Sequence, residues 1–136
     1  MLKKYIMIFC VLTSLLAIPT KAMTDESLYE HFIFEAFFTE KDYIQYYANK
    51  YDAPTQQLLT VAKCESTFNQ NAIGDNGKAN GIFQYHKPTW DRYSILIGEE
   101  LDYHSAHDQA KLTAFIFKNY PNEKMAWTCA RTHGIV

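Results

Sequence analysis

Apolar residues follow two patterns along the 136-residue chain: a continuous run near the start, then helical spacing. The run, residues 5–18, follows a short basic start and precedes the small residue Ala22, as in a secretory signal. It is shorter than the roughly 20 residues that a membrane-spanning helix needs. We therefore expect residues 1–22 to be a cleaved signal peptide, with an uncleaved anchor as the alternative.

The remaining chain is predicted to be mostly helical, because apolar residues recur every three or four positions between capping residues. Thr39 and Asp42 have the spacing of a capping box at one helix start. Ser105 and Asp108 repeat that spacing at another. Asp52 is expected to cap a further helix whose first turn holds a proline. The expected helices cover residues 24–38, 39–51, 52–65, 87–98, 105–120 and 122–131.

One segment, residues 69–81, interrupts the helical pattern. It holds four Asn, three Gly and one Asp, which is the chemistry of turns and loops. The sequence GIFQY, residues 81–85, begins at the last residue of this segment and could form a short strand or close a hairpin. The predicted fold class is therefore mainly α within the α+β class, a helical domain with a Gly/Asn-rich loop or small hairpin. We expect residues 23–51 to be an N-terminal helical extension and residues 52–136 to be the main domain.

Composition and charge limit the kinds of partner that the chain is expected to bind. Apolar residues make up 48 % of the chain, which is enough for one packed core. Removing the signal removes three lysines and no acid, so 10 basic residues remain against 15 acidic ones, a net charge of −5. A chain with this balance is not expected to bind nucleic acid.

Removal of the signal also leaves two cysteines, Cys64 and Cys129. An even number in an exported protein predicts a disulfide. Closing a loop of this length would stabilise the fold by about 4 kcal/mol in the chain-entropy model. Two separate buried thiols are the alternative.

Glu65 is the first candidate for chemistry. With Leu58, Val61 and Ala62 it forms an i, i+3, i+4, i+7 stripe, the stripe that should face the core. Partial burial and the negative end of the helix dipole both disfavour its charged form, so its pKa should be raised. A glutamic acid protonated near neutral pH can act as a general acid. The plain alternative is a solvated glutamate at a helix end.

Residues 65–90, ESTFNQNAIGDNGKANGIFQYHKPTW, resemble the signature region of lysozyme-like lytic transglycosylases of the SLT-domain family. The matching motifs are Glu65-Ser66, Phe68-Asn69, Gly81-Ile82-Phe83-Gln84 and Thr89-Trp90, and the resemblance covers about residues 52–131. It implies a lysozyme-like fold and peptidoglycan as the substrate, with no cofactor.

The resemblance also implies a mechanism. Glu65 would be the single acid/base and would protonate the β-1,4 oxygen that leaves MurNAc. It would then take a proton from the C6 hydroxyl of the same sugar, giving a 1,6-anhydro product. The alternative is a hydrolytic muramidase that uses Glu65 with Asp75 or a bound water, since ordinary glycosidases need two carboxylates. Asp75 is the only candidate in the insert, although its GDNG setting is typical of a turn.

Softer roles are predicted for five further motif residues. Gln84 is expected to hydrogen-bond the sugar, and Ser66 to bond near the carboxylate or the sugar. Phe83, Tyr85 and Trp90 could stack on pyranose rings. The alternatives are a polar strand end for Gln84, a helix cap for Ser66 and core packing for the aromatic residues.

One family feature is missing. Where the family commonly has a late AYNAG-type motif whose tyrosine orients the catalytic glutamate, this chain has MAWTCAR, residues 125–131. The sequence leaves several substitutes open, which are Tyr85, Tyr93, Tyr103 and Tyr120. The same segment would bring a Cys64–Cys129 bridge next to Glu65.

The remaining predictions concern metal, partners and location. His104 and His107 have an i, i+3 spacing, but no further ligands follow, so no metal site is expected. We expect a secreted or periplasmic monomer that acts on glycan strands and has no stable membrane insertion after signal cleavage. A glycan-binding or assembly accessory protein on the same fold is the non-enzymatic alternative.

Overall fold

A computed structural model describes residues 36–136, of which Phe37–Val136 form one compact unit. The predicted signal peptide lies outside the described residues, as does most of the predicted helix over residues 24–38. The helices of the unit are α3 (Glu40–Tyr51), α4 (Thr55–Ser66), α5 (Lys87–Ile97), α6 (Ala106–Asn119) and α7 (Thr128–Thr132), with two 3-10 turns, η1 (Asp75–Gly77) and η2 (Pro121–Ala126). Its strands are β1 (Ile73–Gly74), β2 (Ala79–Asn80) and β3 (Tyr85–His86).

Helix α3 begins at the predicted capping box. The Thr39 hydroxyl accepts from the backbone N–H of Asp42, while the Asp42 carboxylate accepts from the backbone N–H of Thr39. The helix packs along α6 and contributes Ile44, Tyr47 and Ala48 to the core. Part of the segment assigned above to an N-terminal extension therefore belongs to the same core as the rest of the unit.

The predicted cap of α4 is wrong. Asp52 ends α3 in the left-handed conformation, with φ 54°, and its carboxylate pairs with Lys118. Helix α4 begins only after Pro54, which has no side-chain cap. The reason is local: the residue before a proline avoids the helical conformation, so a helix cannot run from Asp52 through Pro54.

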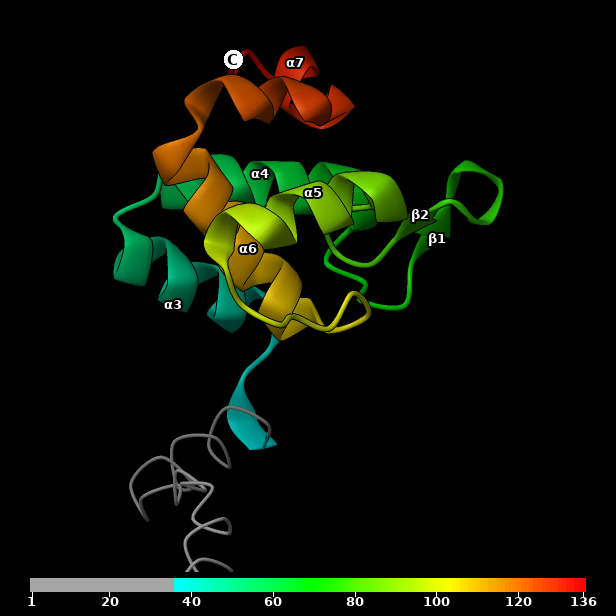
Figure 1. Cartoon of the computed structure of the whole chain (residues 1–136), viewed down its shortest axis with the longest axis horizontal. Coiled ribbons are helices and arrows are strands. Elements are labelled where there is room, and N and C mark those ends of the chain that lie inside the picture. The colour runs from blue at the N-terminus through cyan, green and yellow to red at the C-terminus, as the bar shows by residue number, and fades with distance from the viewer. Residues whose placement is uncertain (1–35) are drawn as a thin grey trace, which may run out of the picture. The chain divides into compact units, whose positions relative to one another are not determined.

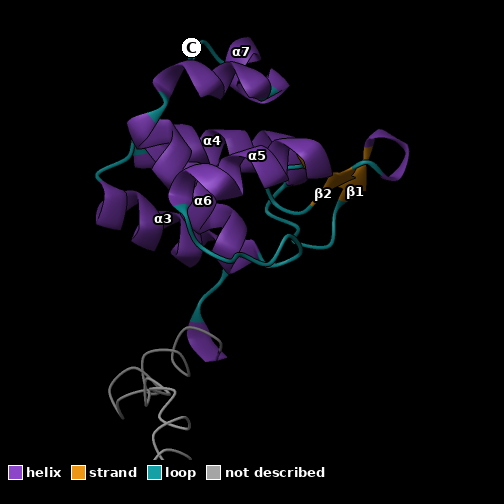
Figure 2. Cartoon of the chain, in the orientation of Figure 1, coloured by secondary structure: helices purple, strands orange, loops and turns teal. Residues whose placement is uncertain are grey.

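The predicted Gly/Asn-rich insert forms a small antiparallel sheet of order β1-β2-β3 beside the helices (Figures 1 and 2). Ile73 pairs with Asn80, and Asn80 in turn pairs with Tyr85. Of the predicted GIFQY strand only Tyr85 is in β3, because Gly81–Gln84 form the turn before it. The small hairpin and the mainly helical α+β fold are both confirmed.

The predicted C-terminal helix over residues 122–131 is interrupted. The 3-10 turn η2 and helix α7 are separated by Trp127, whose backbone is extended. This conformation lets the indole enter the core, where its Nε1–H donates to the carbonyl of Phe83 at 2.9 Å. The extended backbone that buries Trp127 therefore interrupts the predicted continuous helix.

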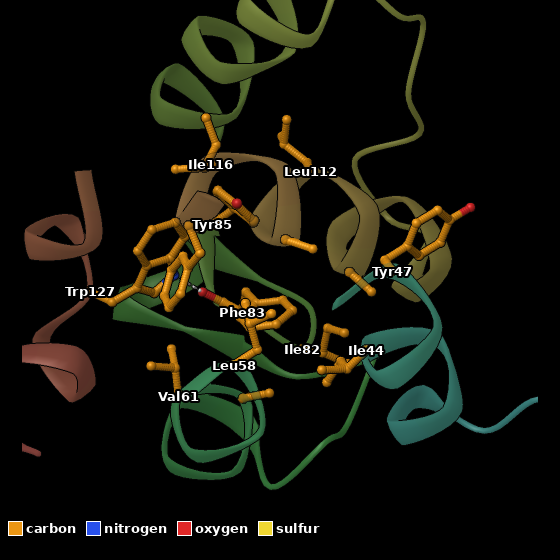
Figure 3. Packing of buried hydrophobic residues seen from close by; sticks show 14 of the residues in the cluster. Ile44, Tyr47, Leu58, Val61, Ile82, Phe83, Tyr85, Leu112, Ile116 and Trp127 are labelled. Atoms are coloured by element: carbon orange, nitrogen blue, oxygen red, sulfur yellow. Dashed lines mark hydrogen bonds between the residues drawn. The ribbon is translucent and has the colours of Figure 1, made fainter. Parts of the chain in front are cut away.

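The core gathers around α6 and the turn before β3 (Figure 3). Leu58 and Val61 of α4 lie below Phe83 and Trp127, while Ile116 and Leu112 of α6 lie above Tyr85. The predicted stripe of α4 thus faces the core, and this fixes where Glu65 at its end must lie.

Candidate functional site

A cleft of about 480 Å³ opens where the C-terminal end of α4 meets the small sheet, the start of α5 and the start of α7. Its lining is mostly polar and consists of Glu65, Asp75, Ala79, Gln84, Tyr85, His86, Thr89, Ala126, Trp127 and Thr128. A larger groove of about 690 Å³ runs along another face of α4, but no carboxylate lines it. Glu65, the acidic residue of α4, therefore lines the smaller cleft.

Glu65 is half-buried at the cleft wall. Its Oε1 accepts a hydrogen bond from the backbone N–H of Cys129 at 3.3 Å. Burial raises the pKa of Glu65, while the Cys129 N–H and the nearby Arg131 act in the opposite direction. Burial is the largest of these effects, so the net shift is upward, as the stripe position predicted.

Ser66 joins the end of α4 to the turn before β3. Its hydroxyl lies 2.9 Å from the carbonyl of Ile82 and 3.2 Å from the carbonyl of Ala62. Both partners are backbone carbonyls of the protein. Ser66 therefore links the end of α4, which bears Glu65, to the turn that bears Gln84.

Gln84 reaches the cleft from an unusual backbone position, with φ 50°. Its Nε2 donates to the carbonyls of Ala72, at 3.1 Å, and Gly81, at 2.9 Å. Because both amide hydrogens are used in this way, the Oε1 atom is what remains to meet a ligand. That oxygen lies against Gly74, where a Cβ atom would approach it to 2.3 Å. Gln84 can accept a hydrogen bond from a ligand but has no hydrogen left to donate.

The stacking role predicted for three aromatic residues does not fit their positions. Phe83 is 0 % exposed, and Tyr85 and Trp90 are each 2 % exposed. Tyr85 packs edge-on against both Trp90 and Trp127. No ring face is open to a pyranose, so these residues act as core, which was the alternative reading.

Asp75 lines the same cleft as Glu65 and lies in the 3-10 turn η1 between β1 and β2. Its carboxylate pairs with His86 across the sheet, with 3.3 Å between Oδ2 and Nε2. Both side chains are about half exposed. The side chain thus contacts His86 of β3 instead of capping its own turn. His86 was not among the predicted site residues, and its position two residues after the Gly81–Gln84 motif gave no signal by itself.

None of the four candidate tyrosines takes the missing orienting role in the described contacts. The hydroxyl of Tyr85 pairs with Thr113, that of Tyr93 donates to Glu123, and that of Tyr103 donates to a backbone carbonyl. Tyr120 lies beside Phe115. The donor to Glu65 is instead the backbone amide of Cys129.

The predicted bridge between Cys64 and Cys129 is present, with 5.9 Å between the Cα atoms. It joins α4 to α7 at the residue directly before Glu65. The covalent link and the amide hydrogen bond therefore act on neighbouring residues of α4.

Gln109 is a supporting residue that sequence reasoning missed. It is 0 % exposed on α6, its Oε1 accepts from the N–H of Phe83, and its Nε2 donates to the carbonyls of Asn80 and Tyr103. A Cβ atom at Gly81 would come within 2.1 Å of this amide. Gln109 thus holds the turn that carries Gln84. The signal available was its spacing, since Gln109 lies three residues after Ala106 and four before Thr113, both buried on α6.

The two histidines with metal-like spacing have other contacts. His107 lies between the Tyr47 hydroxyl, at 2.6 Å, and the Asp108 carboxylate, at 2.7 Å, and so links α3 to α6. Across residues 36–136 no group of three His, Cys, Asp or Glu side chains could hold a metal ion. Within that range, too, no helix is both long and apolar enough to cross a membrane.

A mainly helical domain with a small antiparallel sheet, and with a half-buried glutamate in the cleft between them, has the lysozyme-like α+β fold. The chain belongs to the transglycosylase SLT domain family, whose model matches residues 42–111. The matched region runs from α3 to α6 and includes Glu65, Ser66 and Gln84, whereas Trp127 and Cys129 lie beyond it. Comparisons with curated proteins and with solved structures found no significant match.

Proposed function

We propose that the protein is a peptidoglycan lytic transglycosylase that cleaves the β-1,4 bond between MurNAc and GlcNAc with Glu65 as its single acid/base. The observation that carries the proposal is a half-buried glutamate with a raised pKa on the wall of a polar cleft, within the residues that the family model matches. Peptidoglycan lies outside the cytoplasm, so we expect the protein to act there. We also expect it to act as a monomer.

The reaction needs one group that both donates and accepts a proton. Protonated Glu65 donates its proton to the glycosidic oxygen, and the bond from that oxygen to C1 of MurNAc breaks. The resulting carboxylate takes the proton of the C6 hydroxyl while the C6 oxygen bonds to C1. The product is a 1,6-anhydro end, and Glu65 is protonated again. The acceptor oxygen of Gln84 would meet a sugar N–H or O–H.

Hydrolysis is the second candidate, and Asp75 is the observation that favours it. A second carboxylate in the same cleft could serve a muramidase as nucleophile or base. Its pairing with His86, however, occupies one of its oxygens within the protein.

Mass spectrometry of digested peptidoglycan tests the proposal. Wild type should release muropeptides lighter by one water than hydrolysis products, and Glu65→Gln should slow release by roughly 10²- to 10⁴-fold. Asp75→Asn is the matched carboxylate control and should leave the anhydro product unchanged.

Other outcomes separate the alternatives. Reducing ends that vanish in Asp75→Asn would establish hydrolysis in place of the proposed reaction. If wild type released no muropeptides, the result would favour the alternative of a non-catalytic, glycan-binding accessory protein.

A further inference from the structure

We propose that Cys129 is a positioning residue for Glu65, acting through its backbone amide, and that the Cys64–Cys129 disulfide keeps that amide in place, so that glycan cleavage depends on the redox state of the bridge. The inference rests on the proposed function only in its effect on cleavage. The structural coupling can be tested by itself.

The two links between α4 and α7 lie side by side. Cys64 bonds covalently to Cys129, and the next residue, Glu65, accepts from the Cys129 N–H. The N···O distance of 3.3 Å is long, and catalytic hydrogen bonds often tighten only when substrate binds. A single residue of α7 thus carries both the bridge and the donor.

The carbonyl group of Cys129 is held as well. Its carbonyl oxygen contacts the Thr132 hydroxyl at 3.1 Å and His133 Nδ1 at 2.9 Å, and accepts from the backbone N–H of His133 at 3.2 Å. These contacts are local to α7 and fix its shape without attaching it to α4. Attachment to α4 at this point comes from the disulfide and the Glu65 hydrogen bond.

Helix α7 depends on such an attachment. It has five residues, far fewer than the roughly 12 that an isolated helix needs for marginal stability in water. Buried Trp127 and Ala130 anchor it to the core, and the Trp127 indole donates its hydrogen bond to the carbonyl of Phe83 and not to α4. With the bridge opened, we expect α7 to remain near the core and the Cys129 amide to lose its register with Glu65.

The bridge can be reached without entering the cleft. Cys64 lines the larger groove of about 690 Å³ on another face of α4, together with Lys41, Lys63 and His133. A small thiolate entering that groove meets Lys41 and Lys63, whose positive charges attract an anion.

Reduction takes two thiols. The first thiolate attacks one disulfide sulfur, forms a mixed disulfide and releases the other cysteine as a thiolate, which takes up a proton. A second thiolate then attacks the mixed disulfide. Two protein thiols and one oxidised disulfide of the reagent result.

The test measures the amide and the activity on the same protein. The amide proton resonance of Cys129 is followed by NMR as pH is raised through the titration of Glu65. In oxidised wild type it should move downfield as the carboxylate ionises, because a charged acceptor strengthens the hydrogen bond. Glu65→Gln should abolish the movement. After reduction with dithiothreitol, or in the Cys64→Ser/Cys129→Ser double variant, residue 129 should no longer respond.

Cleavage should follow the same pattern. Reduction should lower kcat by roughly 10- to 100-fold, the effect of a misplaced catalytic group, with KM little changed. Treating the double variant with dithiothreitol controls for other effects of the reagent, and its already lowered rate should not fall further. Circular dichroism shows whether the reduced protein remains folded.

Three results overturn the inference: a Cys129 amide that ignores Glu65 ionisation in oxidised wild type, an amide that still responds after complete reduction, or an unchanged kcat after complete reduction. If the reduced protein unfolds, the amide titration in oxidised wild type decides alone. If wild type cleaves no glycan, the proposed function fails while that titration still tests the coupling.

Discussion

Glu65 illustrates how a single residue can be useful to a site and costly to a fold. Its neighbours on the α4 stripe, Leu58, Val61 and Ala62, are all 0 % exposed, so the backbone draws its carboxyl group towards the core. Burial favours the protonated form, and the hydrogen bond that the Cys129 N–H donates to the carboxylate compensates only in part. The same environment that suits a general acid penalises the charged form.

Replacing Glu65 by Gln should therefore stabilise the protein at neutral pH. The pKa of Glu65 is higher in the folded than in the unfolded chain, so the folded state loses stability as pH rises through that interval. Glu65→Gln removes this loss. The melting temperature of the variant should exceed that of wild type at pH 7, and the excess should disappear below the ordinary glutamate pKa of 4.5.

Glu123 provides the control of opposite sign. Hydrogen bonds from Tyr93 and Arg92 lower the pKa of Glu123, so its charged form stabilises the fold. Glu123→Gln should lower the melting temperature at pH 7, and the deficit should shrink as pH falls through the lowered folded pKa. Equal pH trends for the two variants would contradict the assignment at Glu65.

At the scale of elements, the short strands of the sheet are held by side chains from the helices. Each strand has two residues, which is too little for a sheet to be stable alone. Gln109 from α6 and Ser66 from α4 bond to the backbone of the turn between β2 and β3. The position of Gln84 in the cleft thus depends on two helices.

Gln109→Leu should lower the free energy of unfolding by about 3 kcal/mol, because it leaves a buried N–H and two carbonyls without their partner. Urea unfolding followed by circular dichroism measures the change. Gln45→Leu, at an exposed position of α3, is the matched control and should stay within about 0.5 kcal/mol of wild type. Similar effects of both substitutions would show that the buried amide does not support the turn.

At the scale of the whole molecule, α3 is the element that decides where the folding unit starts. Its residues Ile44, Tyr47 and Ala48 are 1 %, 4 % and 0 % exposed, and Tyr47 also bonds to His107 of α6. Truncating one buried aliphatic side chain to alanine typically costs about 2–5 kcal/mol. Losing the whole helix should exceed the total stability of a small domain, about 5–15 kcal/mol.

A fragment of residues 52–136 should therefore fail to fold, whereas a fragment of residues 37–136 should unfold cooperatively. Thermal denaturation followed by circular dichroism distinguishes the two. A cooperative transition in the shorter fragment would restore the boundary expected from the sequence, with α3 as a dispensable extension.

The sequence by itself determined the helix pattern, the hairpin insert, the bridge between Cys64 and Cys129, and Glu65 as the leading candidate. These follow from local periodicity, turn chemistry and cysteine count, and for Glu65 also from the resemblance of the motifs that follow it, all of which depend on neighbours along the chain. The tertiary structure decided the rest. It buried Phe83 and Trp90 and brought Asp75 against His86. It also supplied the Cys129 amide in place of a tyrosine hydroxyl. Those outcomes depend on which segments, distant in the sequence, come into contact. A backbone amide donor also cannot be predicted from residue type, because nearly every residue has one.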